Sequence, residues 1–181
     1  MKVIEKKSFL AYAGLPVITA ALLILHPLNT DAFLLLRYEV LSVFGYIIAV
    51  NDIKTKRIAN PVVLMMLAAW LIMMLPKLFF DTPAAVTLLV DSVFGFAVSA
   101  VLFLLVYLIS NKGLGGGDVK FMAVSGLYLG FSVSLSAILI GTVLAALTGL
   151  TLILLKTITP KETIPLAPFL YTGMLITIFF T

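Results

Sequence analysis

The feature that most limits how this chain can fold is a series of long, nearly unbroken apolar runs. They cover residues 8–25, 33–51, 61–80, 86–110, 119–131, 135–155 and 165–181. Most of them approach the length of about 20 residues that an α-helix needs to cross a bilayer. Because 62% of the 181 residues are hydrophobic and only 11% are charged, no soluble core of this size could bury them. The sequence therefore predicts an all-α, polytopic transmembrane helix bundle of about six or seven helices.

Two of these runs allow a second interpretation. Residues 8–25 follow a basic N-terminus and could be a cleaved signal peptide, but the run is longer than the roughly 7–15 apolar residues of such a signal. Residues 119–155 could form one helix, but at about 1.5 Å per residue it would be about 55 Å long, whereas the hydrocarbon core is about 30 Å thick. We predict a retained helix at 8–25 and a break in the other run at 130–134.

The basic residues lie mainly on one side of this predicted layout. If the N-terminus is cytoplasmic, ten of the twelve Lys and Arg residues lie on the cytoplasmic side, with Lys77 on the outer side and Arg37 inside a run. This is the distribution of the positive-inside rule, and a single helix at 119–155 would spoil it. We therefore expect one multi-pass domain, 1–181, in the cytoplasmic (inner) membrane, with a cytoplasmic N-terminus.

Two aspartates at the predicted cytoplasmic helix ends are the strongest candidates for chemistry. Asp52 closes the run 33–51, and Asp118 follows the glycine-rich stretch 113–117. Taken alone, Asp52 could simply balance the basic loop that follows it, and Asp118 could be a helix N-cap. Asn60 likewise precedes Pro61 and is predicted to cap the next helix. Together, however, the two aspartates form a carboxyl pair at one membrane depth.

Two neighbouring carboxyl groups are what water-mediated peptide hydrolysis requires. One must be ionised to take a proton from water, and the other must be protonated to polarise the scissile carbonyl. Two carboxyl groups placed close together cannot both ionise cheaply, so their titrations separate. The glycines would also let an extended substrate backbone approach. The sequence leaves open which aspartate takes which role.

The residue inventory excludes several other chemistries. The chain has no cysteine and only one histidine, His26, which excludes disulfides, a cysteine nucleophile and Cys- or His-cluster metal sites. No Gly-Lys-Ser/Thr follows the glycines, so a phosphate-binding loop is excluded as well. The net charge of +4 comes from short loops between membrane segments. We therefore expect no metal, no cofactor and no nucleic-acid partner.

Three stretches carry a resemblance to a known family. Residues 115–120 read GGGDVK, and Asp52 is followed by Ile58-Ala59-Asn60. These are similar to the G-x-G-D-V-K and D-x-x-x-x-x-I-P-N motifs of the type IV prepilin peptidases, the A24 family of GxGD-type membrane aspartic proteases, with Ala59 in place of proline. Residues 164–170, IPLAPFL, resemble the start of the last helix in that family. The resemblance covers roughly residues 40–175.

The resemblance implies an aspartic endopeptidase that removes the leader peptide of prepilins or pseudopilins at the cytoplasmic membrane face. Asp52 and Asp118 would be catalytic, and the substrate and the membrane lipids would be the partners. The residues implied to bind substrate or support the loop are Gly115, Gly116, Gly117, Lys120 and Asn60. Lys120 could favour an ionised carboxylate nearby or merely anchor its helix at the interface. The oligomeric state stays open.

The N-terminal part departs from the large members of that family. Those members carry a methyltransferase domain with a cysteine-ligated zinc, whereas here about seven residues precede the first run and cysteine is absent. We therefore expect the compact, peptidase-only form. In it, the helix at 8–25 is an addition before a peptidase core at about 33–181.

A different class of protein accounts for some of the same residues. A small polytopic transporter or a pilus-assembly membrane subunit could use Glu39, Asp91 and Asp118 to couple ions. A protease requires both aspartates of the pair, whereas a transporter should tolerate Asp52→Asn. A presenilin-type protease lacks support, because no tyrosine precedes Asp52 and no Pro-Ala-Leu follows.

Three further charges fall inside the predicted runs. We expect Arg37 to extend its side chain to the outer surface. Glu39 is expected to pair with Arg37 or Asp91, and Asp91 to lie at a solvated outer position.

Overall fold

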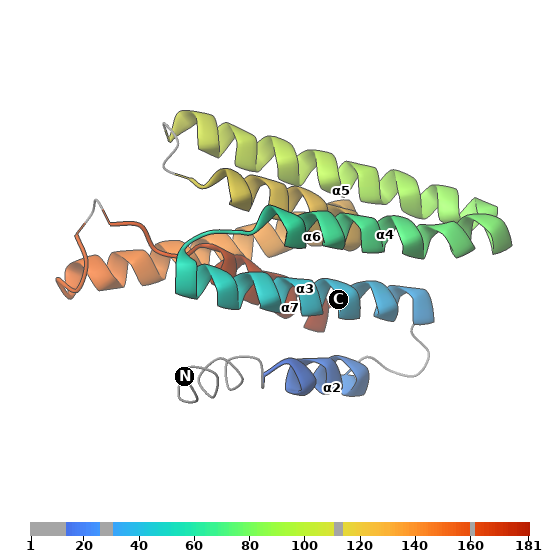
Figure 1. Cartoon of the computed structure of the whole chain (residues 1–181), viewed down its shortest axis with the longest axis horizontal. Helices are drawn as coiled ribbons and strands as arrows, with labels where there is room; N and C mark the ends of the chain where they lie inside the picture. Colours follow the sequence, from blue (N-terminus) through green and yellow to red (C-terminus); the bar gives the residue numbers. More distant parts are fainter. Residues whose placement is uncertain (1–13, 26–30, 111–113, 160–161) are drawn as a thin grey trace.

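The computed structural model describes residues 14–25, 31–110, 114–159 and 162–181 and contains helices and no strand within these ranges (Figure 1). The helices are α2 (Leu15–Leu25), α3 (Ala32–Thr55), α4 (Asn60–Phe80), α5 (Thr82–Ile109), α6 (Gly116–Leu154) and α7 (Ala167–Phe179). Four of them, α3 to α6, are long and apolar enough to cross a membrane. The predicted all-α bundle is thus confirmed. Residues 8–13 of the first predicted helix lie outside the described residues.

The predicted break in the longest apolar run is confirmed, and it falls at Gly130. There the backbone leaves helical geometry, with φ 75° and ψ −177°. The first part of α6 (116–129) and the second part (131–154) run in opposite directions, so the chain returns toward the end from which it came (Figure 1). Lys120 in the first part contacts Asn60 at the start of α4, and Gly149 in the second part lies against Ile164, just before α7.

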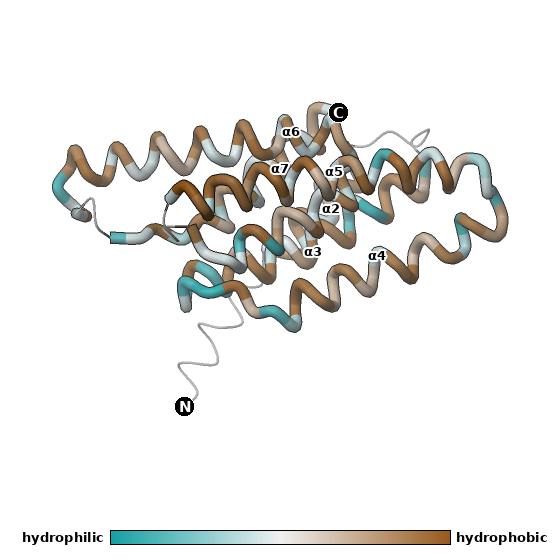
Figure 2. The backbone as a smooth tube through the Cα atoms, turned by 90° about the horizontal axis from the view of Figure 1, so that it is seen from above, coloured by the Kyte–Doolittle hydropathy of each residue, from teal (hydrophilic) through white to brown (hydrophobic). Residues whose placement is uncertain are grey.

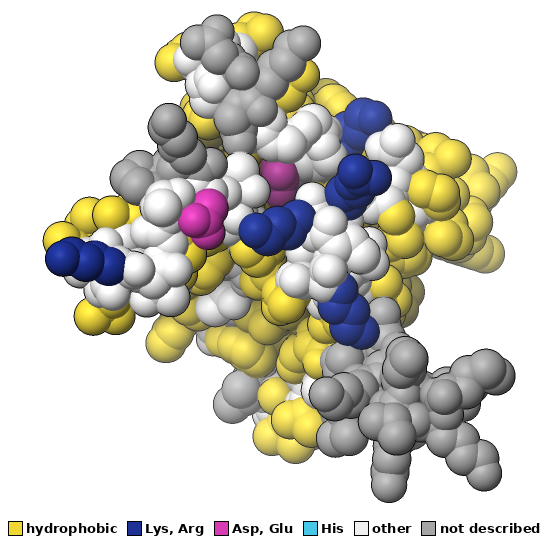
Figure 3. Space-filling model, turned by 60° about the vertical axis from the view of Figure 1, so that its left-hand side comes forward, with side chains coloured by type: hydrophobic (Ala, Val, Ile, Leu, Met, Phe, Trp, Pro, Cys, Tyr) yellow, Lys and Arg dark blue, Asp and Glu magenta, His cyan; other side chains and the backbone are white. Residues whose placement is uncertain are grey.

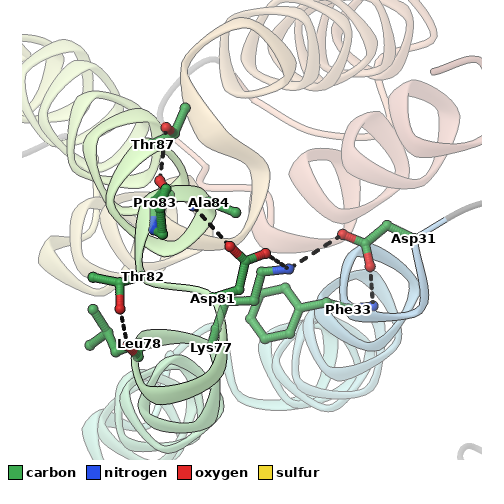
Figure 4. A network of polar contacts seen from close by, with 9 residues as sticks. All are labelled: Asp31, Phe33, Lys77, Leu78, Asp81, Thr82, Pro83, Ala84 and Thr87. Atoms are coloured by element: carbon green, nitrogen blue, oxygen red, sulfur yellow. Dashed lines mark hydrogen bonds and ion pairs between the residues drawn. The ribbon is translucent and has the colours of Figure 1, made fainter.

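The bundle therefore has two distinct ends. At one end α3 terminates and α4, α6 and α7 begin; we call it the Asp52 end. At the other, Lys77 of α4 lies 3.9 Å from Asp31 and 3.6 Å from Asp81 (Figure 4). These two aspartates also accept backbone N–H groups at the starts of α3 and α5. We call this second end the Lys77 end.

The first part of α6 forms the centre of the bundle. Every residue from 121 to 130 is buried, whereas large apolar side chains on the outer faces of the other helices are exposed. Figure 2 shows hydrophobic residues along the helices and hydrophilic residues mainly toward their ends. Such a distribution suits a bundle whose sides face lipid.

Small residues allow the helices to pack closely around this centre. A Cβ at Gly95 of α5 would collide with the carbonyl oxygen of Gly126, and one at Gly173 of α7 would lie 2.5 Å from the backbone nitrogen of Gly141. Close backbone approach of this kind is typical of membrane helix interfaces. It brings α5 and α7 against the two parts of α6.

Candidate active site

Asp52 lies in the last turn of α3 and is only 5% exposed. The helix ends because Lys56 adopts a left-handed conformation, from which its N–H donates to the carbonyl oxygen of Asp52 at 2.7 Å. The carboxylate oxygen Oδ2 of Asp52 accepts the N–H of Ala167 at 3.0 Å. Ala167 is the first residue of α7, so the carboxylate faces the positive end of a helix dipole.

Asp118 lies in the first turn of α6, where it is partly buried. The N-cap of this helix is Gly115, in an extended conformation, so the alternative that Asp118 is the N-cap is wrong. The backbone N–H groups of Gly115 and of Asp118 itself interact with the carboxyl group. Its Oδ1 atom is buried, and no donor in the described part of the chain reaches it.

The structure brings these two carboxyl groups together from two different helices. α3 delivers Asp52 at its C-terminal end and α6 delivers Asp118 at its N-terminal end, and the two side chains are close enough to interact electrostatically. Figure 3 shows an acidic side chain recessed among basic ones on this end of the molecule. A close carboxyl pair of this kind can share acid and base roles.

The three predicted loop glycines differ in their surroundings. A Cβ at Gly115 would lie 2.7 Å from Oδ2 of Asp118, and one at Gly117 would lie 2.8 Å from Cβ of Ile58. At Gly116 no heavy atom would lie within 4 Å of an added Cβ. Two of the glycines therefore permit close contacts inside the protein, and Gly116 faces open space.

Lys120 and Asn60 form a direct contact at the rim of the same end. The Nζ of Lys120 donates to Oδ1 of Asn60 at 3.1 Å, and both residues are exposed. The prediction that Asn60 caps α4 is wrong, because Ala59 is the N-cap and makes no side-chain capping bond. The Asn60 amide instead links the start of α4 to α6.

Of the three charged residues inside the predicted runs, Arg37 and Glu39 differ from the sequence-based expectation. Arg37 is only 3% exposed and donates to the carbonyl oxygen of Leu127, so it does not extend to the surface, because α5 and α6 cover it. No ion pair joins Glu39 to Arg37 or Asp91 among the described residues, and Oε1 of Glu39 is buried without a donor. Asp91 is exposed and accepts the N–H of Phe131. The sequence signal for a special role was the presence of these charges inside apolar runs.

No group of three or more His, Cys, Asp or Glu side chains placed to hold a metal ion occurs in the described ranges. The site contains two carboxyl groups, backbone N–H donors and Gly116, which faces open space. These groups can position and activate a water molecule.

Comparison with known families identifies the chain. The model of the type IV leader peptidase family matches residues 39–150, more than half of the chain and a range that includes both Asp52 and Asp118. Neither the curated proteins nor the solved structures compared with the chain gave a match. The family match begins within α3, after α2. The chain thus belongs to the type IV leader peptidase family.

Proposed function

We propose that this membrane peptidase is an aspartic endopeptidase that removes the leader peptide of prepilins or prepilin-like proteins, with Asp52 and Asp118 as its catalytic pair. The observation that supports this most directly is the approach of the two carboxyl groups from α3 and α6 at one end of the bundle. The membership in a family of leader peptidases supplies the reaction class.

The carboxyl groups of both aspartates interact with backbone N–H groups, which favour the ionised form. The two differ in that only Asp118 has a buried carboxyl oxygen without a donor among the described residues, and this difference suggests their roles. Oδ1 of Asp118 has no donor in the described part of the chain, so it is free to carry a proton. We assign the general base to Asp52 and the general acid to Asp118.

In the proposed reaction a water molecule lies between the two carboxyl groups. Asp52 takes a proton from this water as its oxygen attacks the carbonyl carbon of the scissile peptide bond. Asp118 donates its proton to the carbonyl oxygen, which gives a tetrahedral intermediate. When the intermediate collapses, the proton on Asp52 passes to the leaving nitrogen and Asp118 recovers its own from the hydroxyl, so that the C–N bond breaks.

The surroundings of the pair suggest how the substrate is presented. The open space beside Gly116 would accommodate the extended segment around the scissile bond. The basic residues at this end support a cytoplasmic location for it under the positive-inside rule. The substrate's apolar helix would then stay in the membrane while its leader reaches the two aspartates. The described basic residues of this end are Lys54, Lys56, Arg57, Lys120 and Lys156.

The test is co-expression with a prepilin encoded by the same genome, followed by the size of that prepilin on a gel. We expect the wild-type chain to shorten it, and Asp52→Asn and Asp118→Asn each to abolish shortening, because each removes a group that exchanges a proton. A matched control is Asp81→Asn, which changes an aspartate at the Lys77 end and should leave cleavage intact. Cleavage by either variant of the pair would falsify the assignment.

A further inference from the structure

The break in α6 interrupts the helical hydrogen bonds, and side chains from other helices bond to two of the backbone groups beside it. In a continuous helix the N–H of Phe131 would donate to the carbonyl oxygen of Leu127. Instead it donates to Oδ1 of Asp91 at 3.0 Å. The carbonyl oxygen of Leu127 accepts two other donors, Nη2 of Arg37 and Nε1 of Trp70, each at 3.0 Å.

These three side chains come from three different helices. Arg37 belongs to α3, Trp70 to α4 and Asp91 to α5; we call them the break clamp. Arg37 also donates from Nη2 to Oγ of Ser92 on α5 at 3.4 Å. An unpaired backbone group inside a membrane is costly, so the bonds to Phe131 and Leu127 stabilise the break. The break clamp thus ties α3, α4 and α5 to one point of α6.

That point lies on the helix that carries Asp118. The first part of α6 is short, and all of its residues from 121 on are buried. Tyr128, one residue beyond Leu127, adds a further bond, from its hydroxyl to the carbonyl oxygen of Met66 at 2.6 Å. A buried helix held by directional bonds near its C-terminal end has little freedom to slide or rotate. Its N-terminal end, with Asp118, is therefore held as well.

Helix α3 and the first part of α6 approach each other at two places, the Arg37–Leu127 contact and the Asp52–Asp118 pair. α3 carries both Arg37 and Asp52, while the first part of α6 carries both Leu127 and Asp118. The contact between Arg37 and Leu127 thus fixes how far α3 and α6 are displaced along each other, and this displacement sets the separation of the two carboxyl groups.

We propose that Arg37, supported by Trp70 and Asp91, is a positioning residue for the Asp52–Asp118 pair. By partnering the break at Gly130, the clamp fixes the height and rotation of the helix that carries Asp118. The catalytic part of this inference rests on the proposed function; the geometric part does not, and the two are tested separately.

The geometric test uses the absence of cysteine from the chain. Asp52→Cys and Asp118→Cys are combined, and disulfide formation on copper–phenanthroline oxidation in membranes is followed by mobility on a gel. We expect a cross-link in this pair, and loss of most of it when Arg37→Gln is added. Lys77→Gln is the matched control, because it removes a cation whose ion pairs are with Asp31 and Asp81 at the Lys77 end. An undiminished cross-link with Arg37→Gln would overturn the proposal.

The catalytic test separates kcat from KM for a prepilin substrate. A misplacement of about 1 Å can cost roughly 100-fold in rate, so we expect Arg37→Gln to lower kcat by about that factor with little change in KM. Asp91→Asn keeps an oxygen acceptor for Phe131 and should retain most activity, whereas Asp91→Leu should lose it. A wild-type kcat in both Arg37→Gln and Asp91→Leu would refute a positioning role.

The outcomes remain separable if a step fails. Should the wild-type chain cleave no prepilin, the proposed function falls, and the cysteine cross-link alone decides whether the clamp positions α6. Should Arg37→Gln not accumulate in membranes, Asp91→Leu against Asp91→Asn in the cysteine background takes its place. An equal cross-link in those two variants would then contradict the proposal.

Discussion

At the scale of single residues, the three consecutive glycines before Asp118 have different constraints. Gly117 lies against Ile58, so the start of α6 can approach the loop between α3 and α4 only without a side chain there. Gly115 lies similarly close to the carboxyl group of Asp118. Gly116 has no such neighbour. An alanine would therefore be tolerated at Gly116 and would press on Ile58 at Gly117, whereas at Gly115 it would require the Asp118 carboxyl group to move.

We predict that Gly117→Ala reduces stability by about 1–3 kcal/mol, the usual cost of overpacking, because its Cβ would press on Ile58. Gly116→Ala should leave the stability nearly unchanged and is the matched control. The measurement is thermal unfolding of the detergent-solubilised protein, followed by the fluorescence of Trp70, the single tryptophan. Equal unfolding temperatures for the two variants would show that the contact with Ile58 is unimportant.

At the scale of elements, the reversal of α6 depends on a conformation that only glycine adopts readily. Gly130 combines a φ of 75° with a ψ near 180°, and this region is essentially restricted to glycine. A Cβ there would also collide with Oδ2 of Asp91. Both the backbone conformation and the contact with Asp91 therefore restrict position 130 to glycine.

Gly130→Ala should consequently destabilise the protein, by about 1–3 kcal/mol for the backbone conformation alone. Gly149→Ala, later in the same helix, provides the control, since an added Cβ would meet only Ile164 at 3.4 Å. Thermal unfolding of the two variants side by side measures the difference. If Gly130→Ala unfolds at or above the temperature of Gly149→Ala, the restriction at the break does not hold.

At the scale of the whole molecule, the two ends of the bundle differ in charge. The Asp52 end carries most of the described basic residues, whereas Lys77 at the other end lies within 4 Å of Asp31 and Asp81. From the positive-inside rule we expect the Asp52 end to face the cytoplasm. The proposed cleavage of a leader peptide would then take place on the cytoplasmic side.

We predict opposite labelling of single cysteines at the two ends. In intact cells, a membrane-impermeant maleimide should label Thr82→Cys, at the Lys77 end, and should not label Glu162→Cys, at the Asp52 end. Both should be labelled once the membranes are opened by detergent. Labelling of Glu162→Cys alone in intact cells would invert the proposed orientation.

The sequence predicted the features that depend on length and local conformation. The helix bundle followed from the apolar runs, and the break near Gly130 followed from the limit on helix length. The break clamp was not predicted, because Arg37, Trp70 and Asp91 are far apart in the chain and meet only through helix packing. The cap of α4 was misassigned because the amide of Asn60 bonds to the distant Lys120.

The shortness of the first part of α6 has a consequence for the surrounding lipid. Its length is about 21 Å for about 14 residues, so it ends inside a hydrocarbon layer about 30 Å thick. Protein neighbours enclose it from residue 121 onward. A thinner membrane would thus tilt the outer helices and a thicker one would thin around them. The position of Asp118 would be set mainly by its protein neighbours and not by the acyl chains.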